Sequence, residues 1–194
     1  MTTVRSLCVY CGSSSRVAPH HFEAASRLGA ILAQRRIRLI FGGGHVGLMG
    51  LMADAALAGG GEVIGVIPDF IEDLEVAHPD VTELVVVDSM HARKQKMFEL
   101  ADAFAVLPGG LGTLDETLEI ITWKQLNIHD KPIVLVDVEG YWAPLRGLID
   151  KLVDEGFAGP DALNFFTVVT RVEDVLPALA RAPELAIEPE PSHI

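Results

Sequence analysis

Short apolar runs alternate with helix-like segments along almost the whole chain, and this alternation limits the fold more than any other feature. Seven runs have the composition of buried strands, at residues 4–10, 38–41, 62–67, 84–88, 104–107, 132–136 and 165–169. Helical patterning separates or follows them, at residues 22–35, 48–58, 91–101, 114–126, 141–155 and 172–180. Apolar strands that alternate with helices predict a parallel sheet covered on both faces. We therefore expect a doubly wound, mostly parallel α/β sheet.

The organisation of the chain is simple. Its 194 residues contain no interior linker and no internal repeat, so we expect a single Rossmann-like domain over residues 1–182. Residues 183–194 are rich in Pro and Glu and read as a loose tail. The N-terminus lacks the pattern of a signal peptide, and no run approaches the roughly 20 apolar residues of a membrane span. These features favour a cytoplasmic protein without a membrane segment.

The charge and the cysteines exclude several classes of function. The formal net charge is -12 and aromatic residues make up 6% of the chain, which argues against a nucleic acid polymer as partner. A small phosphorylated ligand remains compatible if local donors overcome the repulsive field. Cys8 and Cys11 lie three residues apart on a predicted strand, so they point to opposite faces and are expected to be small buried hydrophobes. The seven histidines show no zinc-ligand spacing.

The first glycine-rich segment, Gly42 to Gly47, satisfies G-x-G-x-x-G between a strand and a helix. One interpretation is an NAD site with Asp69 as the acid that binds the ribose. The other interpretation is a tight strand-to-helix turn with close packing. The motif follows the second strand rather than the first, which weakens the NAD interpretation.

The second glycine-rich segment runs from Pro108 to Glu116 and also joins a strand to a helix. Its glycines and the helix N-terminus predict an anion site, because backbone N–H groups can turn toward the ligand. The segment lacks the lysine of a Walker loop, which excludes an NTPase of that type. Thr113 and Glu116 also fit a capping box, and Asp115 suits the first helical turn by charge alone. The sequence leaves the cap and the catalytic role of Glu116 open.

The third candidate is the basic pair in Met90-His91-Ala92-Arg93-Lys94, at the start of a predicted helix. Two cations there oppose the helix dipole, so the pair is either a solvated patch or a phosphate clamp in which Arg93 uses its planar fork. We expect Arg93 to be exposed. Glu75 and Thr122, taken alone, read as a surface residue and a routine helix residue.

Four segments together resemble one family. They are GGGHVGLMG at residues 42–50, MHARK at 90–94, PGGLGTLDE at 108–116 and ITWKQL at 121–126. In this order they resemble the motifs of the LONELY GUY (LOG) family of cytokinin-activating phosphoribohydrolases, whose members were often labelled lysine decarboxylases. The resemblance runs from Val4 to Phe157. Two positions depart from the family pattern, since Asp115 replaces a Glu and Leu111 stands where Tyr is frequent.

The resemblance implies a reaction and a site. A cytokinin riboside 5′-monophosphate, or AMP as a second substrate, is hydrolysed to the free base and ribose 5-phosphate, with no cofactor and no metal. By motif position, Arg93 and Glu116 are the catalytic pair. The implied substrate-binding residues are Glu75, Arg93, Lys94, Gly109, Gly110, Leu111, Gly112, Thr113, Leu114, Asp115 and Thr122. The implied crevice lining near the base is Gly12, Ser13, Ser14, Gly43 and Gly44. The family also implies a homodimer.

The chemistry of this reaction gives the two catalytic residues distinct roles. Breaking an N-glycosidic bond builds oxocarbenium character on the ribose, as in glycoside hydrolysis. Glu116 is expected to stabilise that charge and orient water, while Arg93 holds the phosphate or a ribose hydroxyl. Two rival functions remain open from sequence, a non-catalytic nucleotide carrier and an NAD-dependent oxidoreductase.

Overall fold

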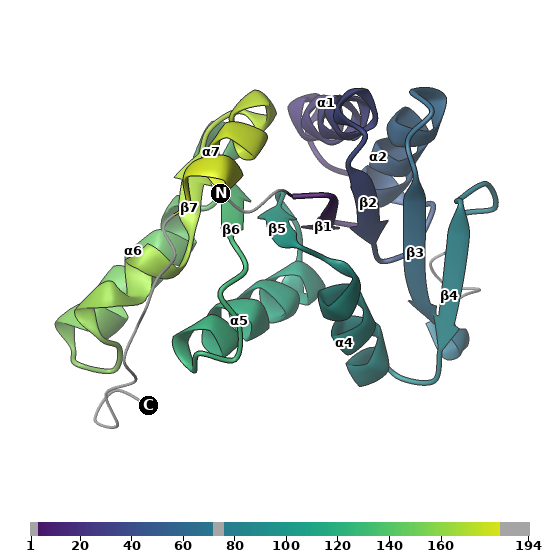
Figure 1. Cartoon of the computed structure of the whole chain (residues 1–194). Helices are drawn as coiled ribbons and strands as arrows, with labels where there is room; N and C mark the ends of the chain where they lie inside the picture. The colour runs from purple at the N-terminus through teal and green to yellow at the C-terminus, as the bar shows by residue number, and fades with distance from the viewer. Residues whose placement is uncertain (1–3, 72–75, 183–194) are drawn as a thin grey trace.

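A computed structural model describes residues 4–71 and 76–182 of the chain. Within these residues, seven strands form one sheet in the order β4-β3-β2-β1-β5-β6-β7 (Figure 1), and every pairing is parallel. The strands are β1 (Ser6–Tyr10), β2 (Arg38–Phe41), β3 (Val63–Pro68), β4 (Glu83–Val87), β5 (Ala103–Val106), β6 (Ile133–Val136) and β7 (Thr167–Val169). The doubly wound α/β expectation is confirmed, and the sheet is parallel throughout rather than mostly.

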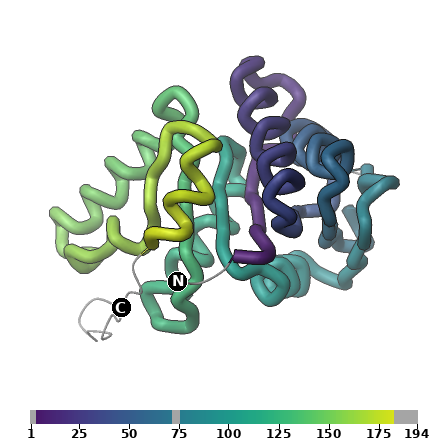
Figure 2. The backbone as a smooth tube through the Cα atoms, turned by 45° about the horizontal axis from the view of Figure 1, so that its top comes forward, coloured from purple at the N-terminus to yellow at the C-terminus, as the bar shows by residue number. Residues whose placement is uncertain are grey.

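Helices cover the sheet on both faces. Helices α1 (Pro19–Arg35), α2 (Gly47–Ala58) and α7 (Val175–Arg181) pack on one face, and in Figure 2 all three lie in front of the sheet. Helices α4 (Met90–Leu100), α5 (Leu111–Gln125) and α6 (Ala143–Asp154) cover the other face. Successive side chains of β1 alternate between the two cores, with Leu7 and Val9 in one and Cys8 and Tyr10 in the other.

The chain order of the strands reverses between β1 and β5. Strands β2, β3 and β4 are added outward on one side of β1, and β5 then returns to the other side, with Tyr10 opposite Val106. Connections after β1 and β5 therefore leave in opposite directions, which opens a crevice at the carboxyl ends of these strands. The backbone beyond them still touches, because the N–H of Gly12 donates to the carbonyl of Pro108 at 3.1 Å.

The helix starts are where sequence and structure differ most. Helix α5 begins at Leu111 and α1 at Pro19, three residues earlier than predicted in each case. Glycine is a poor helix former, so Gly112 masks the first turn of α5 in the sequence. Proline fits the first turn of a helix, as it does at Pro19. The predicted tail at 183–194 lies outside the described residues, and no helix among those described is long and apolar enough to cross a membrane.

Candidate active site

A cavity of about 240 Å³ lies at the crevice between the carboxyl ends of β1 and β5. Its walls come from the end of β1, the turn after β2, helices α2 and α4, and the start of α5. The lining includes Tyr10, Cys11, Gly12, Ser13, Gly42, Met49, Met90, Arg93, Met97, Gly110, Leu111, Gly112, Thr113 and Glu116. Much of the predicted glycine loop, Arg93 and Glu116 thus meet at one cavity, although their roles there stay predictions.

Glu116 reaches the cavity from the second turn of α5. The helix has Gly110 as its N-cap residue, without a capping side chain, and begins at Leu111. Thr113 is therefore the third helical residue and Glu116 the sixth, so the predicted capping box is wrong. Helix capping therefore does not explain why a carboxylate lies at position 116. Because Glu116 lines the cavity, a catalytic role is the stronger interpretation.

The first turn of α5 forms another wall of the cavity. The first N–H groups of a helix have no acceptor within it, and the helix dipole adds partial positive charge there. A Cβ on Gly110 or Gly112 would meet no atom within 4 Å, so these two glycines face open space. A Cβ on Gly109 would overlap the side chain of Thr113, so this glycine is required by close packing. The loop therefore combines a helix N-terminus that suits an anion with open space in front of it.

Arg93 extends from α4 into the cavity wall with only 4% of its surface exposed, so the expectation of an exposed residue is wrong. Its Nη2 donates to the carbonyl oxygen of Gly42 at 2.8 Å, and its Nη1 lies 3.8 Å from Sδ of Met90. A buried guanidinium is costly without hydrogen bonds, so the Gly42 carbonyl helps to fix its position. A Cβ on Gly42 would overlap Nη2 of Arg93, which explains this glycine by close packing.

Two other polar groups at the cavity are held in their neutral forms. Burial raises the pKa of the Cys11 thiol, and the charge of Glu116 raises it further. Burial also raises the pKa of Tyr10, with smaller contributions from Cys8 and Glu116. Cys11 is therefore no thiolate nucleophile at neutral pH. Cys8 and Cys11 are free thiols buried in opposite cores, which confirms their prediction as small buried hydrophobes.

Five of the described residues assigned to the substrate site by motif lie outside the lining of this cavity: Lys94, Gly109, Leu114, Asp115 and Thr122. Nζ of Lys94 pairs with Asp115 at 3.0 Å and with Glu119 at 3.1 Å, which links α4 to α5. Burial alone would lower the pKa of Lys94, but its hydrogen bonds to the two carboxylates outweigh this and raise it. Oγ1 of Thr122 donates to the carbonyl of Leu118 at 2.7 Å, within its own helix.

A second hollow of about 260 Å³ adjoins the first and shares Gly12, Ser13 and Gly110 with it. The predicted crevice residues Gly12, Ser13 and Ser14 all line this hollow, together with Val17, His21, Leu48, Pro108, Gly109 and Tyr141. Oη of Tyr141 donates to the carbonyl of Gly109 at 2.6 Å, which anchors the glycine loop. Sequence reasoning assigned no role to Tyr141 or to the three lining methionines. Met49 and Met90 do lie in the segments 42–50 and 90–94 that carry the family resemblance, whereas no motif marks Tyr141 or Met97.

Gly43 and Gly44 lie next to Gly42 but are not among the residues that line either cavity. The carbonyl of Gly43 accepts the N–H of His78 at 2.9 Å, and Gly44 forms an antiparallel bridge with Ala77. These two glycines therefore hold the segment that leads into β4. Glu75 lies outside the described residues.

Comparison with known sequences gives consistent results. The family model described as "Possible lysine decarboxylase" matches residues 49–179. Cytokinin riboside 5′-monophosphate phosphoribohydrolase LOG7 of Arabidopsis thaliana is 47% identical over 172 residues, which cover 89% of this chain and 79% of that protein. The enzyme LOG1 of the same plant is 46% identical over 180 residues, covering 89% and 84% of the two chains.

Solved structures share the fold at lower identity. The molybdenum cofactor binding protein of Rippkaea orientalis aligns with a TM-score of 0.71 at 20% identity, over 93% of this chain and 98% of that one. The molybdenum cofactor carrier protein of Chlamydomonas reinhardtii aligns with a TM-score of 0.70 at 22% identity, over 91% and 96%. Identities this low support the Rossmann-like fold and carry no information on the ligand.

Proposed function

Because the chain belongs to the family of the cytokinin riboside 5′-monophosphate phosphoribohydrolases, we propose that it hydrolyses the N-glycosidic bond of such nucleotides. The substrates are N6-substituted adenosine monophosphates, with AMP as a second substrate, and the products are the free base and ribose 5-phosphate. The observation that carries the proposal is that Arg93, Glu116 and the first turn of α5 line the same cavity. An anion site beside a carboxylate is the arrangement that this reaction requires.

In the proposed reaction, the bond between C1′ of the ribose and N9 of the base breaks as a water oxygen adds to C1′. The leaving base gains a proton. The carboxylate of Glu116 stabilises the oxocarbenium character of the ribose and accepts a proton from the attacking water. Tyr10 and Cys11 stay protonated beside it, so among the carboxyl, thiol and phenol groups at this cavity Glu116 is the suited base.

The ligand is oriented by its phosphate in this proposal. The loop from Gly109 to Asp115 contributes the first-turn N–H groups of α5, and Arg93 holds a phosphate or ribose oxygen with its planar guanidinium. The bond from Arg93 to Gly42 fixes the plane of that guanidinium. Three thioethers, from Met49, Met90 and Met97, give the purine an apolar, polarisable wall.

The other residues assigned by motif act from outside the cavity in this proposal. Lys94 and Asp115 pair across α4 and α5, and this pair keeps Arg93 and Glu116 on facing helices. Thr122 lies farther along α5 and bonds to its own helix. We retain Gly12, Ser13 and Ser14 as crevice lining beside the base.

Two rival chemistries fit the cavity less well. Decarboxylation of lysine with pyridoxal phosphate requires a lysine that forms a Schiff base, and no lysine is among the described residues that line either cavity. Close packing explains two glycines of the segment Gly42 to Gly47 without an NAD site. A Cβ on Gly42 would overlap Arg93, and one on Gly47 would lie 2.5 Å from the backbone of Ser13.

The test is turnover of a defined substrate. The purified chain is incubated with isopentenyladenosine 5′-monophosphate, and the free base is followed by chromatography. Glu116→Gln should keep the melting temperature and lose activity by about 10²- to 10⁴-fold, the usual contribution of a general base. Glu99→Gln is the matched control, since Glu99 lies on α4, lines neither cavity, and accepts a hydrogen bond from Nε2 of Gln95 at 2.9 Å. Unchanged turnover in Glu116→Gln would exclude the assigned role. Saturable AMP binding without base release would identify a carrier instead.

We also propose that the chain forms a homodimer in the cytoplasm. Large apolar side chains stay exposed on and near α5 and α6, with Leu111 at 85%, Phe157 at 79% and Ile128 at 60%. Burial of such side chains is the usual driving force of a stable interface. The two buried free thiols suit a reducing compartment. Light scattering after size exclusion should give twice the mass of the 20.9 kDa chain.

A further inference from the structure

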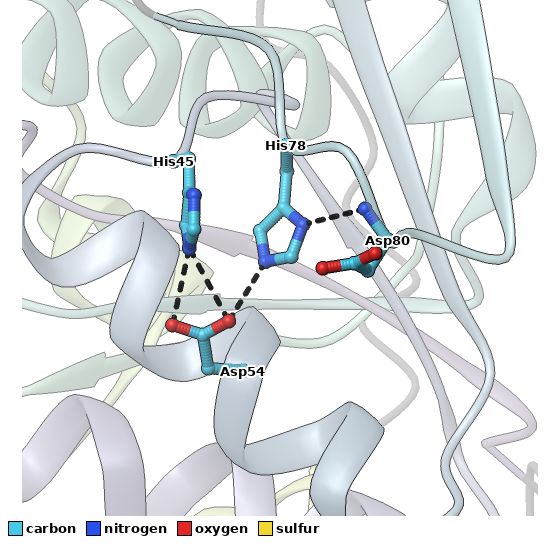
Figure 3. A network of polar contacts seen from close by, with 4 residues as sticks. All are labelled: His45, Asp54, His78 and Asp80. Carbon is cyan, nitrogen blue, oxygen red and sulfur yellow. Dashed lines mark hydrogen bonds and ion pairs between the residues drawn. The ribbon is translucent and has the colours of Figure 1, made fainter.

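Three side chains outside the proposed active site converge beside it (Figure 3). His45 follows the turn of Gly42 to Gly44, Asp54 lies on α2, and His78 lies between β3 and β4. Each offers one nitrogen or oxygen atom, and these atoms all lie within 4.8 Å of one another. None of the three residues lines either cavity. The proposed hydrolysis therefore gives this cluster no role.

The backbone holds the two histidines side by side. The N–H of His45 donates to the carbonyl of Val76 at 2.8 Å, and the N–H of His78 donates to the carbonyl of Gly43 at 2.9 Å. Val76 has a φ of 48°, a left-handed conformation that costs an L-residue about 1–2 kcal/mol. The surrounding structure thus imposes this arrangement against a local cost, and the two imidazoles lie 4.1 Å apart between ring centroids.

The donor atoms have the spacing of a metal coordination sphere. Nε2 of His45 lies 3.3 Å from Oδ1 of Asp54, and Nε2 of His78 lies 3.1 Å from the same oxygen. Around a tetrahedral zinc ion with bonds of about 2.0–2.1 Å, neighbouring donor atoms are about 3.3 Å apart. Two imidazoles and one carboxylate suit zinc and its neighbours in the first transition row, whereas magnesium and calcium prefer oxygen ligands alone.

The three side chains differ in burial. The side chain of His78 is 0% exposed, while those of His45 and Asp54 are 35% and 50% exposed. The exposed side leaves access for a water ligand.

The second ring nitrogen of His78 is also held in place. Nδ1 accepts the N–H of Asp80 at 3.3 Å, and the ring directs Nε2 at the carboxylate of Asp54, 3.1 Å away (Figure 3).

We propose that His45, Asp54 and His78 bind one divalent cation of the zinc type, with water as the fourth ligand. The ion joins three separate segments, the turn after β2, helix α2, and the segment 76–78. The same turn carries Gly42, whose carbonyl accepts the 2.8 Å hydrogen bond from Arg93. The bound ion would steady the backbone against which Arg93 packs. The ligands lie 9 and 24 residues apart, which is why no spacing motif reveals them.

The experiment measures metal binding directly, so its outcome does not depend on the proposed hydrolysis. Tag-free protein is treated with a chelator, desalted and titrated with Co²⁺ and Zn²⁺. We expect one ion per chain, the visible absorption of tetrahedral Co²⁺, and a melting temperature that rises with Zn²⁺. His45→Gln and Asp54→Asn each alter a partly exposed ligand and should fold. Each should weaken binding at least about tenfold, because even changes of outer partners cost that much.

His91→Gln is the matched control, since His91 is exposed on α4 away from the cluster, and it should bind as the parent does. Two results would overturn the proposal. One is the absence of saturable binding at one ion per chain. The other is binding that His45→Gln and Asp54→Asn leave unchanged. Either result would identify the cluster as a metal-free His–Asp–His hydrogen-bond network.

Discussion

Replacing Gly42 with alanine should separate catalysis from folding. An ideal Cβ at this position would overlap Nη2 of Arg93 and lie 3.2 Å from both Cζ of Arg93 and Sδ of Met49. The backbone of Gly42 is not in the left-handed region, so alanine introduces no backbone strain there. The overlapped atom is the end of a long side chain. We therefore expect the guanidinium to move while the fold survives.

The magnitude follows from the hydrogen bond that this movement breaks. Nη2 of Arg93 donates to the Gly42 carbonyl at 2.8 Å, and a hydrogen bond that involves a charged group contributes about 1.5–3 kcal/mol. If this energy positions Arg93 for the transition state, its loss lowers kcat/KM by about 10- to 150-fold. The loss should appear mainly in kcat, because the bond orients a group that acts on the reacting ribotide.

The assay combines turnover of isopentenyladenosine 5′-monophosphate with thermal unfolding of the same samples. Gly147→Ala is the control, since a Cβ there meets no atom within 4 Å and the residue lies inside α6. It should keep full activity and gain about 0.5–1 kcal/mol of stability. An unchanged kcat/KM in Gly42→Ala would refute the argument from packing. A collapse of the melting temperature would show that the backbone yields instead of Arg93.

Two further predictions concern stability and thiol chemistry. Asp102→Ala should cost about 1–3 kcal/mol at neutral pH, because the N–H groups of Arg5 and Ser6 lose an acceptor at 2.8 and 2.9 Å. Burial raises the pKa of Asp102, but these N–H donors outweigh it and lower the pKa overall. The stabilisation is therefore present above the unfolded-state pKa and lost as the pH falls through the folded-state value. Urea unfolding curves of the two proteins should converge in acid, and a gap that stays constant would contradict this. Cys8 and Cys11 should resist thiol reagents in the native protein, because burial raises the pKa of each thiol. Both thiols should react once urea unfolds the chain. Rapid labelling without denaturant would contradict this prediction.

The parallel sheet and the position of the glycine loops follow from sequence more directly than the site does. Alternating apolar runs predict the parallel sheet, and the two glycine loops mark the carboxyl ends of β2 and β5. Helix α5 was predicted three residues late because Gly110 and Gly112 read as a loop. Those glycines begin the helix without side chains, which leaves the space in front of it open. Helix propensity marks both glycines as weak helix formers. It does not reveal that their missing side chains keep this space open.

Contacts across long sequence separations were beyond prediction. Arg93 is buried because a carbonyl 51 residues earlier accepts its hydrogen bond, and nothing near residue 93 in the sequence indicates that partner. The cluster of His45, Asp54 and His78 has the same character, since a bridge between Gly44 and Ala77 brings it together. Local sequence patterns predict individual helices and strands. The Arg93 contact and the histidine cluster depend instead on which loops the strand order places side by side.

The charge balance of the cavity leads to a test that separates binding from chemistry. The chain carries a net charge of -12, Arg93 is the one cation among the described residues that line the cavity, and Lys94 is engaged by two carboxylates. In the proposed site, the phosphate is held by Arg93 and the first turn of α5, with the carboxylate of Glu116 as a neighbour. In the ground state this carboxylate repels the phosphate, and only in the transition state does it meet a positive ribose. Glu116→Gln should consequently bind AMP at least as tightly as the parent while losing turnover. A dissociation constant weakened tenfold would mean that Glu116 holds the ribose hydroxyls in the ground state, and the charge argument for its catalytic role would fail.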